Sequence, residues 1–217
     1  IVILIHQNLY MMLMWQRKVL MLQKNRRKIR WLKRKDVGTL GSYWEANMEL
    51  IDIIPEFNLY EEFWKIYTKT DIIPPQYISA EAVVDRSIIG EGGEIHGEVY
   101  NSVIGPGVVI KKGSVVRDSI IMKQSFIGEN VTIDKAIIAE NVTVGNNVVM
   151  GVGEDVPNKE KPSVYSFGLV TIGENSVIPA DVKIGVNTAI VGETTPEDYP
   201  DGELASGETL NKEGETA

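Results

Sequence analysis

The chain has 217 residues, enough for one domain of ordinary size, and its 43% hydrophobic and 24% charged residues allow a buried core. It contains no Cys and only two His, which excludes disulfides, thiolate chemistry, Cys-bound zinc and a His-rich metal site. The net charge of −8 argues against nucleic acid as the main partner.

The first 35 residues differ from the rest, since they hold ten of the 22 Lys and Arg residues and none of the 30 acidic residues. Their apolar part precedes their basic part, the reverse of a signal peptide, and polar residues interrupt it, unlike a membrane span. The chain begins with Ile1, so we expect a fragment whose residues 1–34 are non-native or frame-shifted, poorly ordered and dispensable. A basic amphipathic helix on a membrane and a nucleic-acid contact are the alternatives.

A helix is predicted shortly after this segment. Ser42 and Glu45 have the spacing of a capping box, which marks a helix start. The apolar residues that follow would share one helix face: Trp44, Met48 and Ile51. The helix should end before Pro55, and we interpret Trp44 as a packing residue rather than a platform for a ligand.

Aliphatic residues recur every six residues between residues 77 and 191, which predicts a parallel β-helix. The first residue of each hexad should point inward and stack on its counterpart in the next coil, and these residues include Ile89, Ile104, Ile110, Ile127, Ile133, Val144 and Ile172. A Gly, Asn or Asp just after it should adopt the positive φ of a corner. A second apolar set should fill the space between corners: Val108, Val131, Val142 and Val148.

Three segments lack the hexad pattern. Residues 57–75 combine aromatic residues with two prolines and are predicted to be a linker packed between two domains. Residues 151–167 are rich in Gly, Pro and charged residues, which indicates a loop that leaves the coils. Residues 193–217 are mostly acidic and polar, so we expect a solvated tail that is disordered after Tyr199.

Few residues suggest chemistry. Acyltransferases built from hexads use a His as general base, and His96 is the candidate here, although its register places it at a corner facing solvent. No sequence pattern indicates a catalytic triad or a Gly-rich phosphate loop. Asp36, followed by Val37 and Gly38 ahead of the predicted helix, could hold a hard cation such as Mg²⁺, and a purely structural Asp fits the same spacing.

Several motifs resemble the bacterial glucose-1-phosphate adenylyltransferases. Lys35–Thr39 and Tyr43–Met48 resemble the signature that closes their catalytic domain, and Ile66–Thr70 with Pro74–Pro75 is similar to their connector. Matches to their coils are Ser119–Met122 and Ala136–Ile138. The resemblance spans roughly residues 35–207.

The resemblance implies a mainly β fold, a left-handed parallel β-helix preceded by the C-terminal remnant of an α/β nucleotidyltransferase domain. The general rule for crossover connections favours the right hand, so the left hand follows from the resemblance alone. Residues 35–76 would be the end of the catalytic domain and its connector, residues 77–191 the β-helix, and residues 192–217 an acidic tail.

The family converts ATP and glucose 1-phosphate into ADP-glucose and pyrophosphate for glycogen biosynthesis, using Mg²⁺. Its second metal-binding Asp falls on Asp36, which the resemblance therefore implies as a catalytic and metal-binding residue. The family is cytoplasmic and allosteric, and its β-helix assembles a tetramer, here a homo-oligomer or a hetero-oligomer with a related subunit. Neither nucleic acid nor a membrane is an expected partner.

The family's nucleotide loop, first metal Asp and sugar-phosphate lysines lie upstream of the matched motifs. We therefore expect no cofactor-binding residue in this fragment and no activity of the fragment alone. Arg34 also stands where the family has an aromatic residue. The alternatives are a non-catalytic partner subunit of the same pathway, a hexapeptide-repeat acyltransferase, and a related guanylyl- or thymidylyltransferase.

Overall fold

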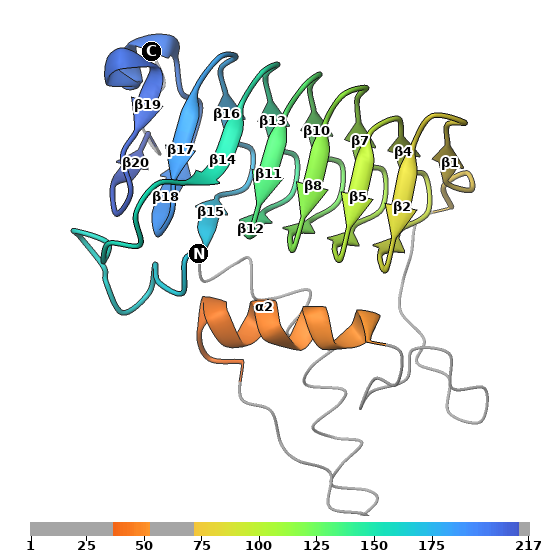
Figure 1. The fold of residues 1–217 in the computed structure, drawn as a ribbon, viewed down its shortest axis with the longest axis horizontal. Coiled ribbons are helices and arrows are strands. Elements are labelled where there is room, and N and C mark those ends of the chain that lie inside the picture. The colour runs from red at the N-terminus through yellow and green to blue at the C-terminus, as the bar shows by residue number, and fades with distance from the viewer. Residues whose placement is uncertain (1–36, 53–71, 213–217) are drawn as a thin grey trace, which may run out of the picture. The chain divides into compact units, whose positions relative to one another are not determined.

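The computed structural model describes residues 37–52 and 72–212. The predictions for residues 1–34, for Asp36 and for most of the linker lie outside the described residues. The described residues belong to one compact unit. Within it, helix α2 (Leu40–Met48) and the 3₁₀ turn η1 (Glu49–Ile51) precede a long series of short strands (Figure 1).

These strands form three parallel sheets, each built from every third strand. Sheet A contains β1 (Tyr77–Ile78), β4 (Glu94–Ile95), β7 (Val109–Ile110), β10 (Phe126–Ile127), β13 (Thr143–Val144) and β16 (Val177–Ile178). Sheet B contains β2 (Val83–Asp85), β5 (Glu98–Tyr100), β8 (Val115–Arg117), β11 (Thr132–Asp134), β14 (Val149–Val152), β17 (Lys183–Gly185) and β19 (Glu203–Leu204). Sheet C contains β3 (Ile88–Ile89), β6 (Val103–Ile104), β9 (Ile120–Ile121), β12 (Ala136–Ile138), β15 (Val170–Ile172), β18 (Thr188–Val191) and β20 (Thr209–Asn211).

The chain therefore winds through sheets A, B and C in turn, and up to β18 each strand pairs with a strand three places away, whereas β19 and β20 pair with β17 and β18, two places back. This is a parallel β-helix, which confirms the predicted mainly β fold and agrees with the left-handed form of hexapeptide repeats. Two 3₁₀ turns near its end, η2 (Pro196–Asp198) and η3 (Pro200–Gly202), connect β18 to β19. No helix in the described part of the chain is long and apolar enough to cross a membrane.

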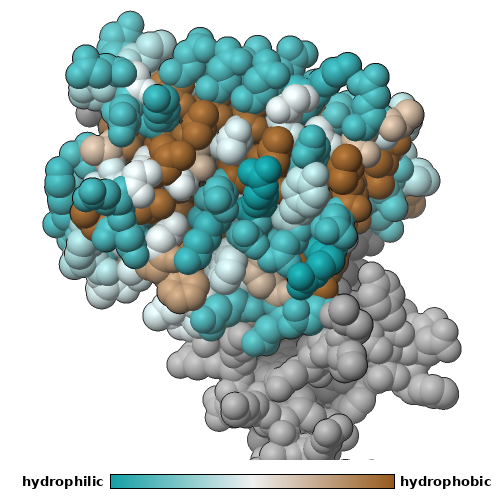
Figure 2. Space-filling model, viewed as in Figure 1, coloured by the Kyte–Doolittle hydropathy of each residue, from teal (hydrophilic) through white to brown (hydrophobic). Residues whose placement is uncertain are grey.

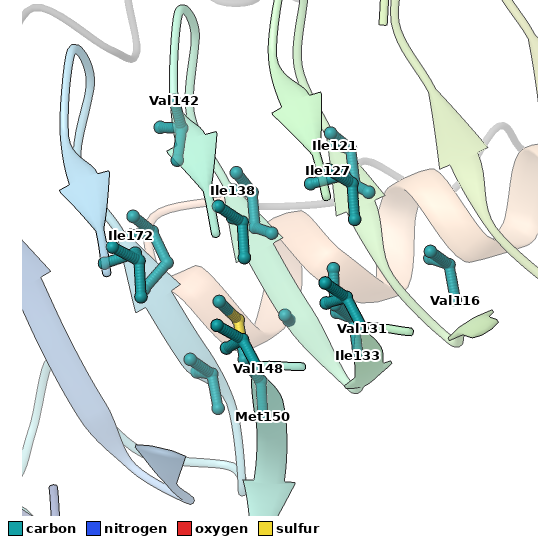
Figure 3. Close-up of a cluster of buried hydrophobic side chains, with 14 of the residues drawn as sticks. Val116, Ile121, Ile127, Val131, Ile133, Ile138, Val142, Val148, Met150 and Ile172 are labelled. Atoms are coloured by element: carbon teal, nitrogen blue, oxygen red, sulfur yellow. The ribbon is translucent and has the colours of Figure 1, made fainter. Parts of the chain in front are cut away.

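The hexad residues form the core, as predicted. The predicted inward residues from Ile104 onward are at most 1% exposed, and Ile89 in the first coil packs against them. The second apolar set is fully buried between the corners: Val108, Val131, Val142 and Val148. Figure 3 shows part of this core, in which side chains of successive coils lie against one another, among them Ile127, Ile133 and Ile172. The hexad period therefore directly records which residues face the core.

Buried serines add hydrogen bonds between successive coils. The Ser114 hydroxyl donates to the Gly128 carbonyl at 2.6 Å and accepts from the Val131 amide, 17 residues away, at 2.9 Å. Ser119 accepts from the Ala136 amide at 3.0 Å, again 17 residues away. These hydroxyls form hydrogen bonds with backbone groups at the corners, which would otherwise be buried without a partner.

The structure corrects the predicted role of the corner glycines. The residue with positive φ lies two or three positions after the inward residue, as at Asn130, Asn141 and Asn147 with φ of 55–59°. The Gly directly after the inward residue is needed for a different reason, namely the closeness of the next coil. A Cβ on Gly145 would lie 2.6 Å from the Ala180 amide nitrogen, far closer than a Cβ can approach.

The predicted helix start is also wrong. Thr39 is the N-cap of α2, and Thr39 and Ser42 form the capping box in place of Ser42 and Glu45. The Thr39 hydroxyl accepts from the Ser42 amide at 3.2 Å, and the Ser42 hydroxyl accepts from the Thr39 amide at 3.1 Å. A serine can fill the place of the Glu because its hydroxyl reaches the same backbone amide.

The acidic tail predicted after Val191 is ordered through residue 212, and the expected disorder after Tyr199 is wrong for these residues. Strands β19 and β20 extend sheets B and C by one more rung. Leu204 and Leu210, six residues apart, continue the hexad spacing and pack on the core, and Tyr199 is 3% exposed. The last coil is ordered because its apolar residues pack on the core, although acidic residues are the most frequent in its sequence.

The alternation on β11 gives a first prediction. Ile133 is fully buried, whereas its neighbour Thr132 points outward and is half-buried. Ile133→Asp should lower the free energy of unfolding by more than about 3 kcal/mol, because it buries an unpaired carboxylate. Thr132→Asp is the matched control and should cost much less. A urea titration measures both, and a loss below ~1 kcal/mol for Ile133→Asp would contradict the register.

Gly145 gives a second prediction. If only its backbone mattered, Gly145→Ala would stabilise the chain, because alanine restricts the unfolded state. The close approach of Ala180 predicts the opposite, a loss of about 1–3 kcal/mol from overpacking. Gly107→Asn, at a corner with φ of +68° and more space around it, should be nearly neutral. A gain in melting temperature for Gly145→Ala would refute this account.

Candidate functional site

The predicted metal ligand Asp36 lies outside the described residues, and α2 begins four residues after it. Among the residues that the structure describes, no group of three or more His, Asp or Glu side chains could hold a metal ion. The described element nearest to Asp36 in the sequence is helix α2, so the contacts of α2 are the structural information available on this region.

Helix α2 packs on the outer face of sheet C. Ile120 of β9 and Ile137 of β12, each 3% exposed, point out of the sheet and form a second apolar cluster with Leu169. The α2 side chains that cover this cluster recur at helical spacing: Leu40, Tyr43, Trp44 and Met48. This confirms Trp44 as a packing residue, whereas Ile51 lies in the turn η1 rather than in the helix.

Polar contacts fix α2 on this face. The Trp44 indole Nε1–H donates to the Asp118 carbonyl at 2.6 Å, which satisfies the indole on the apolar sheet. The Lys135 ammonium lies 5.6 Å from the centre of the Trp44 ring and 4.3 Å from that of Phe167. The two aromatic rings are themselves 5.9 Å apart and tilted by 60°. Three segments far apart in sequence thus meet beside α2.

Burial raises the pKa of the Tyr43 phenol to about 12, and the nearby Glu140 carboxylate adds to the shift. A hydrogen bond with Asn47 opposes it in part. Glu140 is itself paired with Lys123, whose ammonium lies 3.0 Å from a carboxylate oxygen. The tyrosine is therefore a neutral, uncharged part of the α2 interface over the whole physiological range.

His96 lies elsewhere, beside an open hollow of about 320 Å³ lined by Ser79, Ala80, Glu81, His96, Lys111, Lys112 and Glu129. Its side chain is 32% exposed, as the corner prediction requires, and Nε2 lies 3.9 Å from a Glu94 carboxylate oxygen. The Lys112 ammonium contacts Glu81 at 2.6 Å, and this hydrogen bond lowers the pKa of the Glu81 carboxyl. The hollow is a surface feature with paired charges, and its geometry gives His96 no oriented nucleophile.

The sequence reasoning missed three residues at the α2 interface: Asp118, Lys135 and Phe167. For Asp118 a signal existed, because the indole N–H of a half-buried Trp44 needs a hydrogen-bond acceptor. Lys135 occupies a positive-φ corner where the preceding coils place Arg86, Asn101 and Asp118, so its residue type gave no signal. The path of the loop that brings Phe167 to this corner leaves no trace in the hexad pattern.

The Tyr43 phenol gives a prediction on pH dependence. A folded-state pKa of about 12, against an ordinary 10.0, favours the protonated form, so its stabilisation is complete below pH 10 and is lost as the pH rises towards 12. At pH 11 the charge on Tyr43 should cost about 1.4 kcal/mol relative to pH 8. Tyr43→Phe should lose correspondingly less stability between these pH values in urea titrations, with Tyr77→Phe as an exposed control. Equal losses in Tyr43→Phe and wild type would contradict the burial argument.

Comparison with known proteins agrees with this architecture. Residues 75–172 match the family model described as GlmU-like, C-terminal hexapeptide. A glucose-1-phosphate adenylyltransferase from Lachnospira eligens is 66% identical over 181 residues, which cover 83% of this chain and 43% of the relative. Relatives of the same name from Acetivibrio thermocellus and Thermotoga maritima are 46% and 53% identical, over 84% and 80% of this chain and 43% and 41% of their own length.

The chain thus spans less than half the length of these curated relatives. The matched family model places the hexapeptide repeats of residues 75–172 in a C-terminal domain. The predicted resemblance to the C-terminal part of glucose-1-phosphate adenylyltransferases is confirmed by these similarities.

Proposed function

We propose that the chain is the C-terminal part of an enzyme that makes ADP-glucose and pyrophosphate from ATP and glucose 1-phosphate in glycogen biosynthesis. The observation that carries this proposal is the 66% identity over 181 residues with a glucose-1-phosphate adenylyltransferase. Because the names of the similar proteins agree, neither a hexapeptide-repeat acyltransferase nor a non-catalytic partner is favoured.

In this proposal Asp36 is a catalytic residue that holds Mg²⁺ in the intact enzyme. Mg²⁺ commonly takes one or two protein carboxylates and completes its shell with water and phosphate oxygens. When bound, it would offset the negative charge on the phosphates of ATP. The described residues contain no group of three or more His, Asp or Glu side chains that could hold a metal ion. The support for Asp36 is its place in the motif that leads into α2.

The β-helix would serve assembly and allosteric control, in a cytoplasmic tetramer of one subunit or of two related subunits. Its outer faces carry exposed apolar side chains, among them Tyr77 at 57%, Val83 at 42% and Phe126 at 38% exposure. Apolar residues also appear among polar ones on the face shown in Figure 2. Apolar side chains gathered on a sheet surface are typical of a face that binds another subunit.

The proposal predicts that the 217-residue chain alone makes no ADP-glucose and does not bind ATP at micromolar concentrations. Nucleotidyl transfer needs a loop around the phosphates, a cation for the sugar phosphate and a second carboxylate, in addition to Asp36. A chimera that joins residues 35–217 to the N-terminal part of the Lachnospira eligens relative should be active. In that chimera, Asp36→Asn should lower kcat by orders of magnitude and leave the melting temperature nearly unchanged.

Asp52→Asn is the matched control, because this Asp is exposed at the other end of the helix, where it pairs with Arg86 at 3.6 Å. The control should keep normal turnover. Pyrophosphate release by the chain alone, or normal turnover in the Asp36→Asn chimera, would show that the active site is misplaced. An inactive chimera with native-like stability would reject the proposed function itself.

A further inference from the structure

The loop between β14 and β15, residues 153–169, is fastened to the last coils of the β-helix. Asn158 in this loop is 2% exposed, and its amide donates to the Asn187 carbonyl at 3.0 Å and to the Thr209 hydroxyl at 3.1 Å. The Lys159 ammonium contacts a Glu208 carboxylate oxygen at 2.6 Å. The loop leaves and re-enters the coils in Figure 1 as the teal trace between β14 and β15, and these contacts give it a defined path.

One side chain, Asn187, joins the two ends of this β14–β15 loop. It is 3% exposed, and its amide donates to an Asp155 carboxylate oxygen at 2.6 Å and to the Val156 carbonyl at 2.8 Å. Its carbonyl oxygen accepts from the Gly168 amide at 2.7 Å. The position of Gly168, and of Phe167 before it, is therefore set by a corner of the last coils.

Phe167 is held in a conformation that a bulky residue rarely adopts. Its φ is +70°, in the left-handed region, and its side chain is not buried, since the residue is 46% exposed. Burial thus does not explain the strain. The ring instead lies against α2, where a Cβ on Gly41 would be only 3.3 Å from its Cγ, and beside the Trp44 ring.

Lys135 completes the contact from the β-helix side. Its ammonium lies near the faces of both Phe167 and Trp44, at 4.3 and 5.6 Å from the ring centres. A cation within about 6 Å of an aromatic ring is attracted to the ring face. Lys135 sits at a corner between β11 and β12, so it links the coils to the loop and to α2 at one point.

Helix α2 depends on such contacts. It has nine residues, none of them fully buried, and helices this short are unstable in isolation. The helix should therefore form only when it is docked on sheet C, so that folding and docking of α2 occur together. We propose that Phe167 and Lys135 hold α2 on the β-helix, and that the β14–β15 loop thereby lets the last coils set the position of this helix.

Resting on the proposed function, Phe167 and Lys135 would be positioning residues for the reaction, because α2 continues directly from the segment of Asp36. They would act through their contacts with the helix. The loop would then connect the C-terminal coils, where Asn187 and Thr209 lie, to the end of the catalytic domain.

Hydrogen exchange of the 217-residue chain tests the proposal without any assay of activity. The amides of residues 43–48 report α2 docking, and those of β10–β13 report the core. Phe167→Asn should relieve the positive-φ strain and keep the core protected, while α2 exchanges about tenfold faster because the ring contacts are lost. Lys135→Met, which keeps the apolar stem, should have the same effect, and Lys135→Arg should restore slow exchange.

Lys111→Met is the matched control, since Lys111 lies 5.6 Å from the Phe126 ring on sheet A, away from α2. It should leave the exchange of α2 unchanged. Unchanged α2 exchange in both Phe167→Asn and Lys135→Met, or equal acceleration of α2 and the core, would overturn the proposal. In the active chimera both variants should lower kcat severalfold; full turnover with a loosened α2 would overturn the positioning role alone, whereas an inactive parent chimera would count against the proposed function only.

Discussion

The stacking of one aliphatic side chain on its counterpart a coil away determines the rest of this structure. Every strand has only two to four residues, too few to be stable alone, and each coil buries its inward residues against the neighbouring coils. The backbone of one coil must then lie directly under that of the next. This closeness explains why Gly145 tolerates no side chain and why buried serines can reach the backbone of the adjacent coil. Apolar stacking sets the spacing, and the polar contacts follow from it.

The same regularity creates the place where α2 binds. An outward position on sheet C recurs in every coil, and in the middle coils it carries Ile120 and Ile137, which water would otherwise cover. A short amphipathic helix can cover these apolar residues, and the indole N–H of Trp44 donates to the Asp118 carbonyl at the adjoining corner. The β-helix therefore does more than form its own core. It supplies half of the interface that gives the helix after Asp36 its stability.

The sequence could predict the core because a hexad pattern is itself a record of burial, and Ile104 to Ile172 lie where the period places them. It could not tell whether a glycine is needed for a positive φ or for the close approach of the next coil, since both requirements select glycine. Thr39 and Ser42 form the capping box three residues before the predicted pair of Ser42 and Glu45, because two pairs with this spacing occur in the same stretch. The last coil was hidden because Leu204 and Leu210 are only two apolar residues among many acidic ones. Contacts such as Lys135 with Phe167 depend on a loop path that no local pattern encodes, and Asp36 lies outside the described residues.

The strands of the last coil, β19 and β20, also affect how readily two copies of the chain could pair through their sheet edges. A parallel β-helix ends in strands whose outer backbone groups have no neighbour, and such edges can pair with the edge of another molecule. Here strands β19 and β20 are short, Glu203 is the first residue of β19, and Glu208, which pairs with Lys159, precedes β20. Repulsion between like charges opposes the end-to-end joining of two copies. The acidic residues of the C-terminal segment thus belong to an ordered coil, where charged side chains beside a strand edge oppose its pairing with another edge.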